Sequence, residues 1–466
     1  MDDIKIPIKK LINLPFRNNR NERLKTNILQ AIPFWVASLI TGLIAVFYTK
    51  IFALIEKLSI NTFHAHIWWM FIISPICFVL ARWIVKNFSP FARGSGIPQV
   101  MASVELANNK QTEKINKLLS VRIIIVKIIS SILMAFGGGA VGKEGPIIHI
   151  AGAVFRIVNN LLPSWWPKVS KKNMIMTGAA AGLAAAFNTP LGGIVFAVEE
   201  LTKVHLNNFR TSIFTAVIIA GLTVQSLLGS YLYLGFPIVT SLSYTILFGV
   251  ILVAILSGLM GSGMGKIIWI IFKWKATFKK DYYNYIFVLF SSIAIVSMAS
   301  FVNENILGSG KSLMESSLFT ADKYSNWYMP LLRIFGSVFS FTTGASGGIF
   351  APGLSCGGSI GSVISGWFNL SSSETNVLIL AGMTAFLTGI TRAPFTSAIL
   401  VLEMTDRNNL ILHLMLASII ANIVSKIIDK HSLYEYLKVQ YLREIRLESN
   451  DIKQEKEEDS TTLINN

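Results

Sequence analysis

The sequence predicts an all-α polytopic membrane protein made of two related halves, with many tilted and discontinuous helices. Only 14% of the 466 residues are charged, and the mean hydropathy is +0.56. Soluble globular proteins carry about 25% charged residues. Long apolar tracts account for the difference, and a helix satisfies its own backbone hydrogen bonds inside lipid. The lipid bilayer is therefore the expected environment, and an internal repeat predicts the two halves.

Several apolar tracts approach or exceed the roughly 17–25 residues that a helix needs to cross the hydrocarbon core. They are residues 32–55, 67–86, 211–234, 243–273, 286–302 and 410–428. Other apolar tracts, such as 147–162, are shorter or are interrupted by glycine and proline. These shorter tracts predict helices that enter the membrane without crossing it.

The net charge of +16 is concentrated in flanks and loops, as in KWKATFKK at 273–280. Basic residues in such places follow the positive-inside rule, so we expect no nucleic-acid partner. Residues 1–28 are expected to form a basic cytoplasmic tail and residues 29–436 a single transmembrane transport domain. Residues 437–466 are expected to form a charged tail with no room for a further folded domain.

The sequence contains no residue pattern typical of a metal site or of an enzyme active site. Cys77 and Cys356 stand in apolar or glycine-rich surroundings, and the six histidines do not cluster with carboxylates. An intramembrane enzyme needs a nucleophile with a base, or metal ligands such as a histidine pair. The apolar tracts offer neither, so we predict no metal site, no cofactor and no enzymatic activity.

Two stretches of the first half recur in the second half. Residues 138–152, GGAVGKEGPIIHIAG, align with 344–358, GASGGIFAPGLSCGG, at an offset of 206. Residues 177–199 align with 381–403 at an offset of 204. The coinciding residues include the pairs Gly142 and Gly348, Pro146 and Pro352, Pro190 and Pro394, and Glu199 and Glu403. The repeat predicts halves of roughly 29–235 and 240–436 that meet at a pseudo-two-fold axis, where many transporters bind their substrate.

The first repeated motif predicts two helix starts that bind an anion. Proline is favoured in the first turn of a helix, so Pro146 and Pro352 mark these starts. The first N–H groups of a helix lack internal acceptors and carry partial positive charge, which suits a small anion inside a membrane. Glycine lets an ion approach the backbone closely. We therefore expect an anion cradle at these helix starts, made by Gly142, Lys143, Gly145 and Gly348.

Glu144 is a carboxylate at the first of these helix starts. A charge at membrane depth costs on the order of 2.5–3.5 kcal/mol on insertion scales, which makes it a functional candidate. One interpretation is an acidic residue that offsets the helix-start N–H groups. The sharper interpretation is a gate, because the carboxylate and an anion compete for the same N–H groups. Protonation neutralises the carboxylate and releases it, which couples proton binding to anion movement.

Two hydroxyl-bearing residues are further candidates. Ser95, in RGSGIPQV, precedes a helix start near Pro98. A serine N-cap is the ordinary interpretation, and a hydroxyl donor to the anion is the alternative. Tyr434 follows the last apolar tract, and from the sequence alone it is best interpreted as an interfacial aromatic residue.

Three charged residues remain in or beside apolar runs. Glu199 and Glu200 end the run PLGGIVFAVEE, where a helix can simply reach the membrane surface. Glu199 aligns with Glu403, whereas Glu200 aligns with Met404, which suggests that Glu200 acts outside the symmetric scaffold. Lys127 is a lone cation in VRIIIVKIISSILM, and we expect it to snorkel or to pair with a carboxylate.

Taken together, these motifs resemble the CLC chloride channel/transporter family. The resemblance rests on GSGIP at 94–98, GKEGP at 142–146, GGIFAP at 347–352, PLGGIVFAVEE at 190–200 and the Tyr434 segment, in the family's order. It covers nearly all of residues 29–436. It implies a homodimer in which each subunit has its own anion pathway, made of two inverted-topology repeats.

The resemblance also implies roles for individual residues. The hydroxyls of Ser95 and Tyr434 and the backbone N–H groups of Ile349 and Phe350 coordinate the central chloride. Glu144 matches the external gate and proton acceptor.

Glu200 matches the internal proton-transfer glutamate of the family's exchangers, which the channels generally lack. The implied function is chloride/proton antiport, with a passive voltage- or pH-gated chloride channel as the alternative. Ser95 favours chloride, because nitrate-preferring members tend to carry proline there. A sodium-coupled carrier stays open on architecture alone.

The chain departs from the family pattern in two places. Lys143 stands where arginine is frequent, and the C-terminal tail has no room for the paired CBS domains of eukaryotic members. The second departure points to a compact, prokaryote-like form. We therefore expect a multi-pass protein of the cell (inner) membrane with both termini cytoplasmic, which transports chloride and protons without a cofactor.

Overall fold

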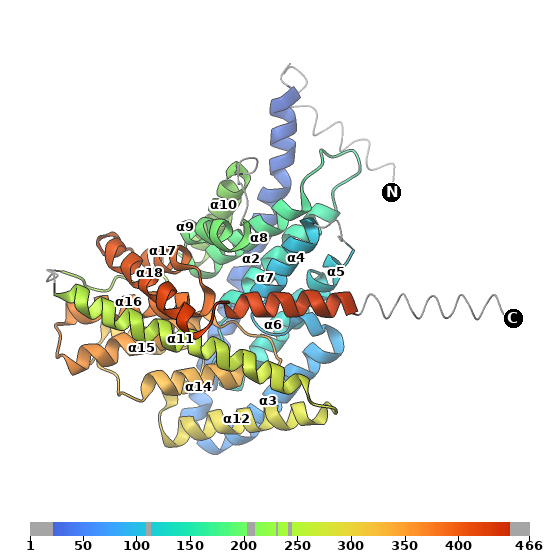
Figure 1. Ribbon diagram of the computed structural model, residues 1–466. Helices are drawn as coiled ribbons and strands as arrows, with labels where there is room; N and C mark the ends of the chain where they lie inside the picture. Colours follow the sequence, from blue (N-terminus) through green and yellow to red (C-terminus); the bar gives the residue numbers. More distant parts are fainter. Residues whose placement is uncertain (1–21, 109–112, 203–209, 230–231, 241–244, 448–466) are drawn as a thin grey trace.

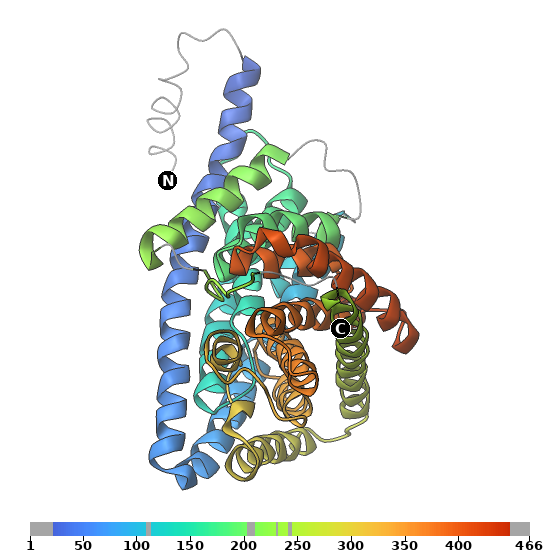
Figure 2. The same ribbon diagram turned by 90° about the vertical axis from the view of Figure 1, so that its left-hand side faces the viewer.

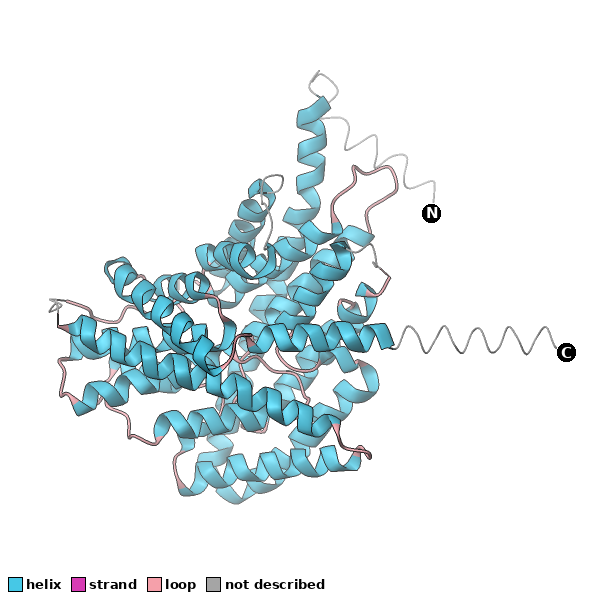
Figure 3. Cartoon of the chain, viewed as in Figure 1, coloured by secondary structure: helices cyan, strands magenta, loops and turns pink. Residues whose placement is uncertain are grey.

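The structure is a computed structural model, and it describes residues 22–108, 113–202, 210–229, 232–240 and 245–447. Within these ranges the chain consists of helices joined by loops, without a β-strand (Figure 3). This agrees with the predicted all-α class.

The helices of the first half begin with one long element, α2, which runs along one side of the molecule (Figure 2). The elements are α2 (Glu22–Ala65), α3 (Ile67–Phe88), η2 (Pro90–Ala92), α4 (Ile97–Asn108), α5 (Ile115–Leu118), α6 (Val121–Phe136), α7 (Glu144–Asn160), α8 (Lys171–Phe187), α9 (Pro190–Phe196), η3 (Ala197–Thr202) and α10 (Arg210–Leu228).

The helices of the second half gather mostly to the left of α4 to α7 in Figure 1. The elements are α11 (Ile246–Ala276), α12 (Tyr282–Phe301), η4 (Glu304–Ile306), α13 (Lys311–Phe319), α14 (Met329–Phe341), α15 (Phe350–Trp367), α16 (Ser372–Thr391), α17 (Pro394–Thr405), η5 (Asn408–Leu410) and α18 (Ile411–Ile428).

Eight helices in the described ranges are long and apolar enough to cross a membrane. Six of them correspond to the predicted tracts, and the other two are Ile115–Phe136 and Ser372–Thr391. The second has the lowest mean hydropathy of the eight, 1.2, and lies almost wholly inside the protein. A helix surrounded by protein needs few large apolar residues, which is why its sequence gave a weak signal.

The internal repeat corresponds to matched packing. Helix α7 packs on α8, which contacts α9 and α10, and α15 packs on α16, which contacts α17 and α18. Small residues allow these close approaches, since a Cβ at Gly182 of α8 would lie 3.0 Å from the Ile148 Cα of α7. The two halves therefore share one arrangement, and α9 and α17 contact each other across them.

One predicted apolar tract differs from the structure. The tract 211–234 does not form one helix, because α10 ends at Leu228 and residues 232–240 are non-helical. Residues 433–447 form one helix, which runs across the expected boundary between the membrane domain and the tail at 436. Tyr441, Leu442 and Ile445 of this helix are buried. These buried side chains pack the beginning of the charged tail against the rest of the protein.

Candidate functional site: an anion cradle with a carboxylate at its mouth

The starts of α7 and α15 are joined by two backbone hydrogen bonds. The Gly142 N–H donates to the Gly348 carbonyl at 2.8 Å, and the Gly348 N–H donates to the Gly142 carbonyl at 2.7 Å. These two glycines are each other's equivalents in the sequence repeat. Reciprocal contact between equivalent residues is what a two-fold relation between the halves produces.

Glycine is required at this junction because the two backbone segments approach each other closely. A Cβ at Gly348 would lie 2.8 Å from the Gly142 carbonyl oxygen and 3.0 Å from the Gly145 nitrogen. A Cβ at Gly145 would overlap the Ser95 hydroxyl. The structure thus brings Gly142, Gly145 and Gly348 together and places Ser95 against them.

Backbone N–H groups point out of the first turn of α15. Ile349 is the N-cap residue and Phe350 the first residue of this helix, and both are buried. N–H groups in these positions have no acceptor in a preceding turn. In α7 and in α15 the helix begins two residues before the proline, so Pro146 and Pro352 lie inside the first turn.

The hydroxyls of Ser95 and Tyr434 are buried and have no hydrogen-bond partner. The exposed fraction is 2% for Ser95 and 0% for Tyr434. The two hydroxyls lie close to each other, but their geometry is not that of a hydrogen bond. Ser95 is therefore not an N-cap and Tyr434 is not an interfacial residue. Buried hydroxyls without partners are costly, and a shared ligand would satisfy both.

Lys127 holds the loop that carries Ser95. Its ammonium is fully buried and donates to the carbonyl oxygens of Ala92, at 2.8 Å, and Gly94, at 3.0 Å. The expected snorkelling or carboxylate pairing is therefore wrong. Carbonyl partners carry no residue-type signal, so the sequence could not reveal them.

Ion pairs connect the Ser95 region to the Tyr434 helix. Arg93 pairs with Glu444 at 2.6 Å, and Lys438 pairs with Glu105 of α4 at 3.0 Å. The Arg93 guanidinium also lies 4.9 Å from the centre of the Tyr441 ring. These contacts fix the last described helix relative to α4 and so fix the two hydroxyls.

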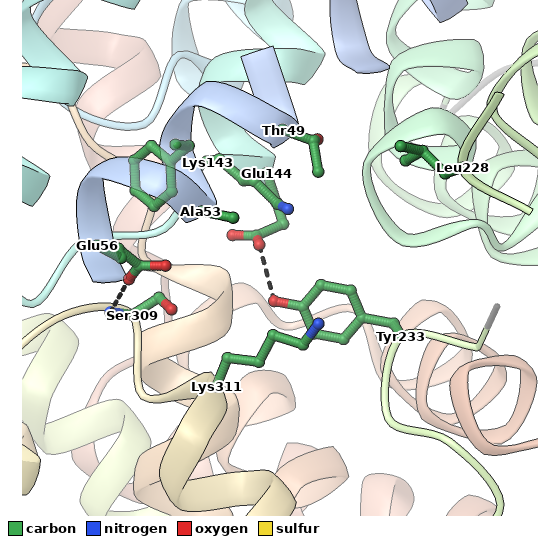
Figure 4. Close-up of a pocket in the computed structure, with 10 residues that line it drawn as sticks. Thr49, Ala53, Glu56, Lys143, Glu144, Leu228, Tyr233, Ser309 and Lys311 are labelled. Atoms are coloured by element: carbon green, nitrogen blue, oxygen red, sulfur yellow. Dashed lines mark hydrogen bonds between the residues drawn. The ribbon is translucent and has the colours of Figure 1, made fainter. Parts of the chain in front are cut away.

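The Glu144 carboxylate points into a cavity beside the start of α7, towards the Tyr233 hydroxyl (Figure 4). Its exposed fraction is 1%, and its Oε1 accepts a hydrogen bond of 2.9 Å from the Tyr233 hydroxyl. Its Oε2 is buried without a hydrogen-bond partner. A Cβ at Gly142 would overlap this oxygen and would lie 3.2 Å from the Ala351 Cβ. The carboxylate thus borders both this cavity, which we call the Glu144 cavity, and the starts of α7 and α15.

The Glu144 cavity has a volume of about 250 Å³. Its lining includes the charged residues Glu56, Lys143, Glu144 and Lys311, which come from α2, the α7 start and α13. Glu56 accepts a hydrogen bond from the Ser309 N–H at 2.7 Å. Tyr233, Glu56 and Lys311 were not identified from the sequence, because each lies outside the repeated motifs.

The two glutamates of η3, which directly follows α9, differ in their surroundings. Glu199 accepts hydrogen bonds from the Phe395 and Thr396 N–H groups at the start of α17. Its repeat equivalent, Glu403, accepts them from the start of α9. This reciprocal contact confirms that Glu199 belongs to the symmetric scaffold. Glu200 is half-buried on the short η3 segment.

The Tyr434 hydroxyl lies within electrostatic range of both Glu200 and Glu144. The Tyr434 ring contacts Phe350, with ring centres 6.2 Å apart. The sequence-predicted residues Ser95, Glu144, Glu200, Phe350 and Tyr434 therefore gather around one buried region. The described residues contain no group of three or more histidine, cysteine, aspartate or glutamate side chains suited to a metal ion.

A family model described as voltage gated chloride channel matches residues 77–426. The chain belongs to this family. Curated relatives include the H(+)/Cl(-) exchange transporters ClcA of Citrobacter koseri and Salmonella paratyphi B, each 26% identical over 89% of both chains. The resemblance inferred from the motifs is thereby confirmed.

Solved structures of membrane antiporters share the fold. A slow cyanobacterial Cl-/H+ antiporter is similar with a TM-score of 0.76 and 23% identity, over 89% of this chain and 98% of that one. A CLC-type fluoride/proton antiporter is similar with a TM-score of 0.73 and 20% identity, over 88% and 98%. The predicted fold class, an all-α membrane protein with a CLC-like fold, is confirmed.

Proposed function

We propose that this protein is a secondary active antiporter that exchanges chloride for protons across the membrane. The observation that carries the proposal is the position of Glu144. One carboxylate oxygen is buried without a partner at the junction of the two helix starts. It lies close to the two reciprocal hydrogen bonds between Gly142 and Gly348, which we call the glycine bridge. An anion and this carboxylate thus have access to the same neutral cradle, so their occupancies exclude each other.

The central chloride is proposed to bind at the Ser95 and Tyr434 hydroxyls and at the N–H groups of Ile349 and Phe350. The supporting observation is that both buried hydroxyls lack a partner in the protein. Four neutral donors hold a chloride without a fixed opposite charge, so the ion can leave again. Gly142, Lys143, Gly145 and Gly348 are proposed to form the helix-start part of the cradle.

Protons are proposed to move between Glu200 on the inner side and Glu144 on the outer side. When Glu144 takes up a proton it loses its charge and its attraction to the helix-start N–H groups. Chloride can then occupy the vacated cradle. Return of the ionised carboxylate displaces the chloride, and this alternation couples the two ions in opposite directions.

Membership of the family supports the remaining proposals. We propose a homodimer in the cell (inner) membrane, with both termini cytoplasmic and with chloride and protons as the transported substrates. Neither a cofactor nor enzymatic chemistry is needed, because gradients of the two ions supply the energy. The basic tail 1–28, the membrane domain from 29 and the charged end of the chain fit this orientation.

The test is simultaneous measurement of chloride and proton flux by the purified protein in liposomes. An outward chloride gradient should drive protons uphill into the vesicles. Glu144→Gln should abolish proton movement while chloride flux persists. A wild-type protein that dissipates chloride without moving protons uphill would instead be the passive channel. A requirement of the flux for sodium would identify a sodium-coupled carrier.

A further inference from the structure

The Tyr233 hydroxyl is the side-chain donor that the structure gives to the Glu144 carboxylate. The hydrogen bond is 2.9 Å long, and the exposed fractions of the two residues are 2% and 1%. A hydrogen bond to an ionised acceptor is stronger than one between neutral groups, and burial strengthens it further. The bond therefore favours the ionised carboxylate in this position.

The Tyr233 ring is fixed by contacts that do not involve Glu144. It packs edge-on against Phe187 with ring centres 5.1 Å apart. The neighbouring Leu234 N–H donates to the Met404 carbonyl of α17 at 3.2 Å. The Lys311 ammonium lies 5.0 Å from the ring centre. The hydroxyl is thus held in place before the carboxylate arrives, which lowers the entropy cost of the bond.

Other charged and titratable groups also face Glu144. Lys143 and Lys311 attract the carboxylate, and Glu56 of the cavity wall carries the same charge sign. Tyr48 and Tyr434 also lie within the range of its charge. The Tyr48 hydroxyl is instead paired with Ser131, at 2.6 Å. Tyr48 is therefore a matched tyrosine without the bond to the gate.

We propose that Tyr233 is a positioning residue that docks the Glu144 carboxylate at the mouth of the cradle and sets the external pH at which exchange begins. We call the Tyr233–Glu144 hydrogen bond the outer latch. The inference rests on the proposed exchange function. Protonation of Glu144 removes the charge on which the latch depends, so the latch opposes the step that frees the cradle.

Tyr233→Phe tests the latch because it removes the hydroxyl and keeps the ring contacts. Chloride and proton flux would be measured in liposomes over a range of external pH. The rate should reach half of its maximum at a pH about one unit higher than in the wild type, which corresponds to a tenfold lower proton concentration. Lys311→Met should shift the midpoint in the same direction by less, and it provides a second variant if Tyr233→Phe does not fold.

Tyr48→Phe is the matched control and should leave the pH midpoint unchanged. Adding Tyr233→Phe to Glu144→Gln should change nothing further, because the charged acceptor is already absent. An unshifted midpoint in Tyr233→Phe, an equal shift in Tyr48→Phe, or an equal effect in the Glu144→Gln background would overturn the latch. If the wild type moves chloride but no protons, exchange is wrong, and the pH profile of chloride flux still tests the latch.

Discussion

Helices α7 and α15 occupy equivalent places in the two halves, yet their first residues differ. Glu144 begins α7 and Phe350 begins α15, at the repeat offset of 206. The glycines before them are identical and bond to each other. The residues after α9 and those near the end of α17 show the same combination of a matched and an unmatched position. Glu199 aligns with Glu403, but the next residue, Glu200, aligns with Met404.

This comparison distinguishes residues that hold the two halves together from residues that are proposed to carry protons. Positions that match between the halves bond across the junction, as the glycine bridge and the Glu199 and Glu403 contacts show. The two titratable groups of the proposed proton route, Glu144 and Glu200, occur in the first half only. In the proposed pathway, a symmetric framework thus holds asymmetric chemistry: the first half supplies both titratable groups, and the second half supplies the backbone donors of Ile349 and Phe350.

The largest expected effect comes from making the two halves alike at position 200. Glu200→Met gives η3 the residue that α17 has at Met404. We expect uphill proton transport to vanish, because the inner carboxylate is gone, while chloride flux continues. The measurement is the coupled flux in liposomes. Undiminished proton flux in this variant would mean that the difference between the halves at this position has no role in coupling.

The next largest effect is expected from alanine substitutions at the two glycines of the bridge, Gly142 and Gly348. Gly348→Ala puts a Cβ 2.8 Å from the Gly142 carbonyl oxygen, so the backbones must separate. Overpacking of this kind costs about 1–3 kcal/mol. At Gly142 the Cβ would instead overlap the Glu144 Oε2, the end of a flexible side chain.

We therefore expect Gly348→Ala to lower the melting temperature more than Gly142→Ala does. Gly142→Ala should mainly disturb gating, seen as a changed pH dependence of chloride flux. Size-exclusion chromatography after heating in detergent measures the first property, and liposome flux measures the second. Equal losses of stability in both variants would show that the two sides of the bridge are equally rigid.

The sequence predicted the parts of the site that depend on local chemistry. Glycine, proline and glutamate at a helix start have few alternative uses inside a membrane, so Glu144 and the glycine bridge were identifiable. Ser95 and Tyr434 remained ambiguous, because a hydroxyl before a helix and a tyrosine after an apolar tract both have ordinary roles. Only their burial without partners separates the alternatives.

Other features depend on contacts that are remote in sequence. Tyr233 lies in a non-helical segment after α10 and has no motif of its own. Its proximity to Glu144, 89 residues away, arises from the packing of the helices. Lys127 binds carbonyl oxygens, which every residue supplies. Helix α16 is enclosed by protein, so it carries neither the strong apolar signal nor the charged face on which sequence interpretation depends.

The smallest expected effect concerns the matched pair Glu199 and Glu403. Each carboxylate accepts hydrogen bonds at the start of the other half's helix, α17 or α9. Glu199 also accepts one from the Thr396 hydroxyl at 2.7 Å. Removal of a cap costs about 0.5–2 kcal/mol, so Glu199→Ala and Glu403→Ala should each lower the melting temperature. Glu199→Ala should lower it slightly more, because it loses one additional donor.

Both alanine variants should keep the wild-type ratio of protons to chloride, since neither carboxylate lies on the proposed proton route. The matched comparison is with Glu200, one residue further along the chain, whose loss should change that ratio. A change of the ratio in Glu199→Ala but not in Glu403→Ala would place Glu199 on the proton route. The division between symmetric scaffold and asymmetric pathway would then fail at the position where the two are closest in sequence.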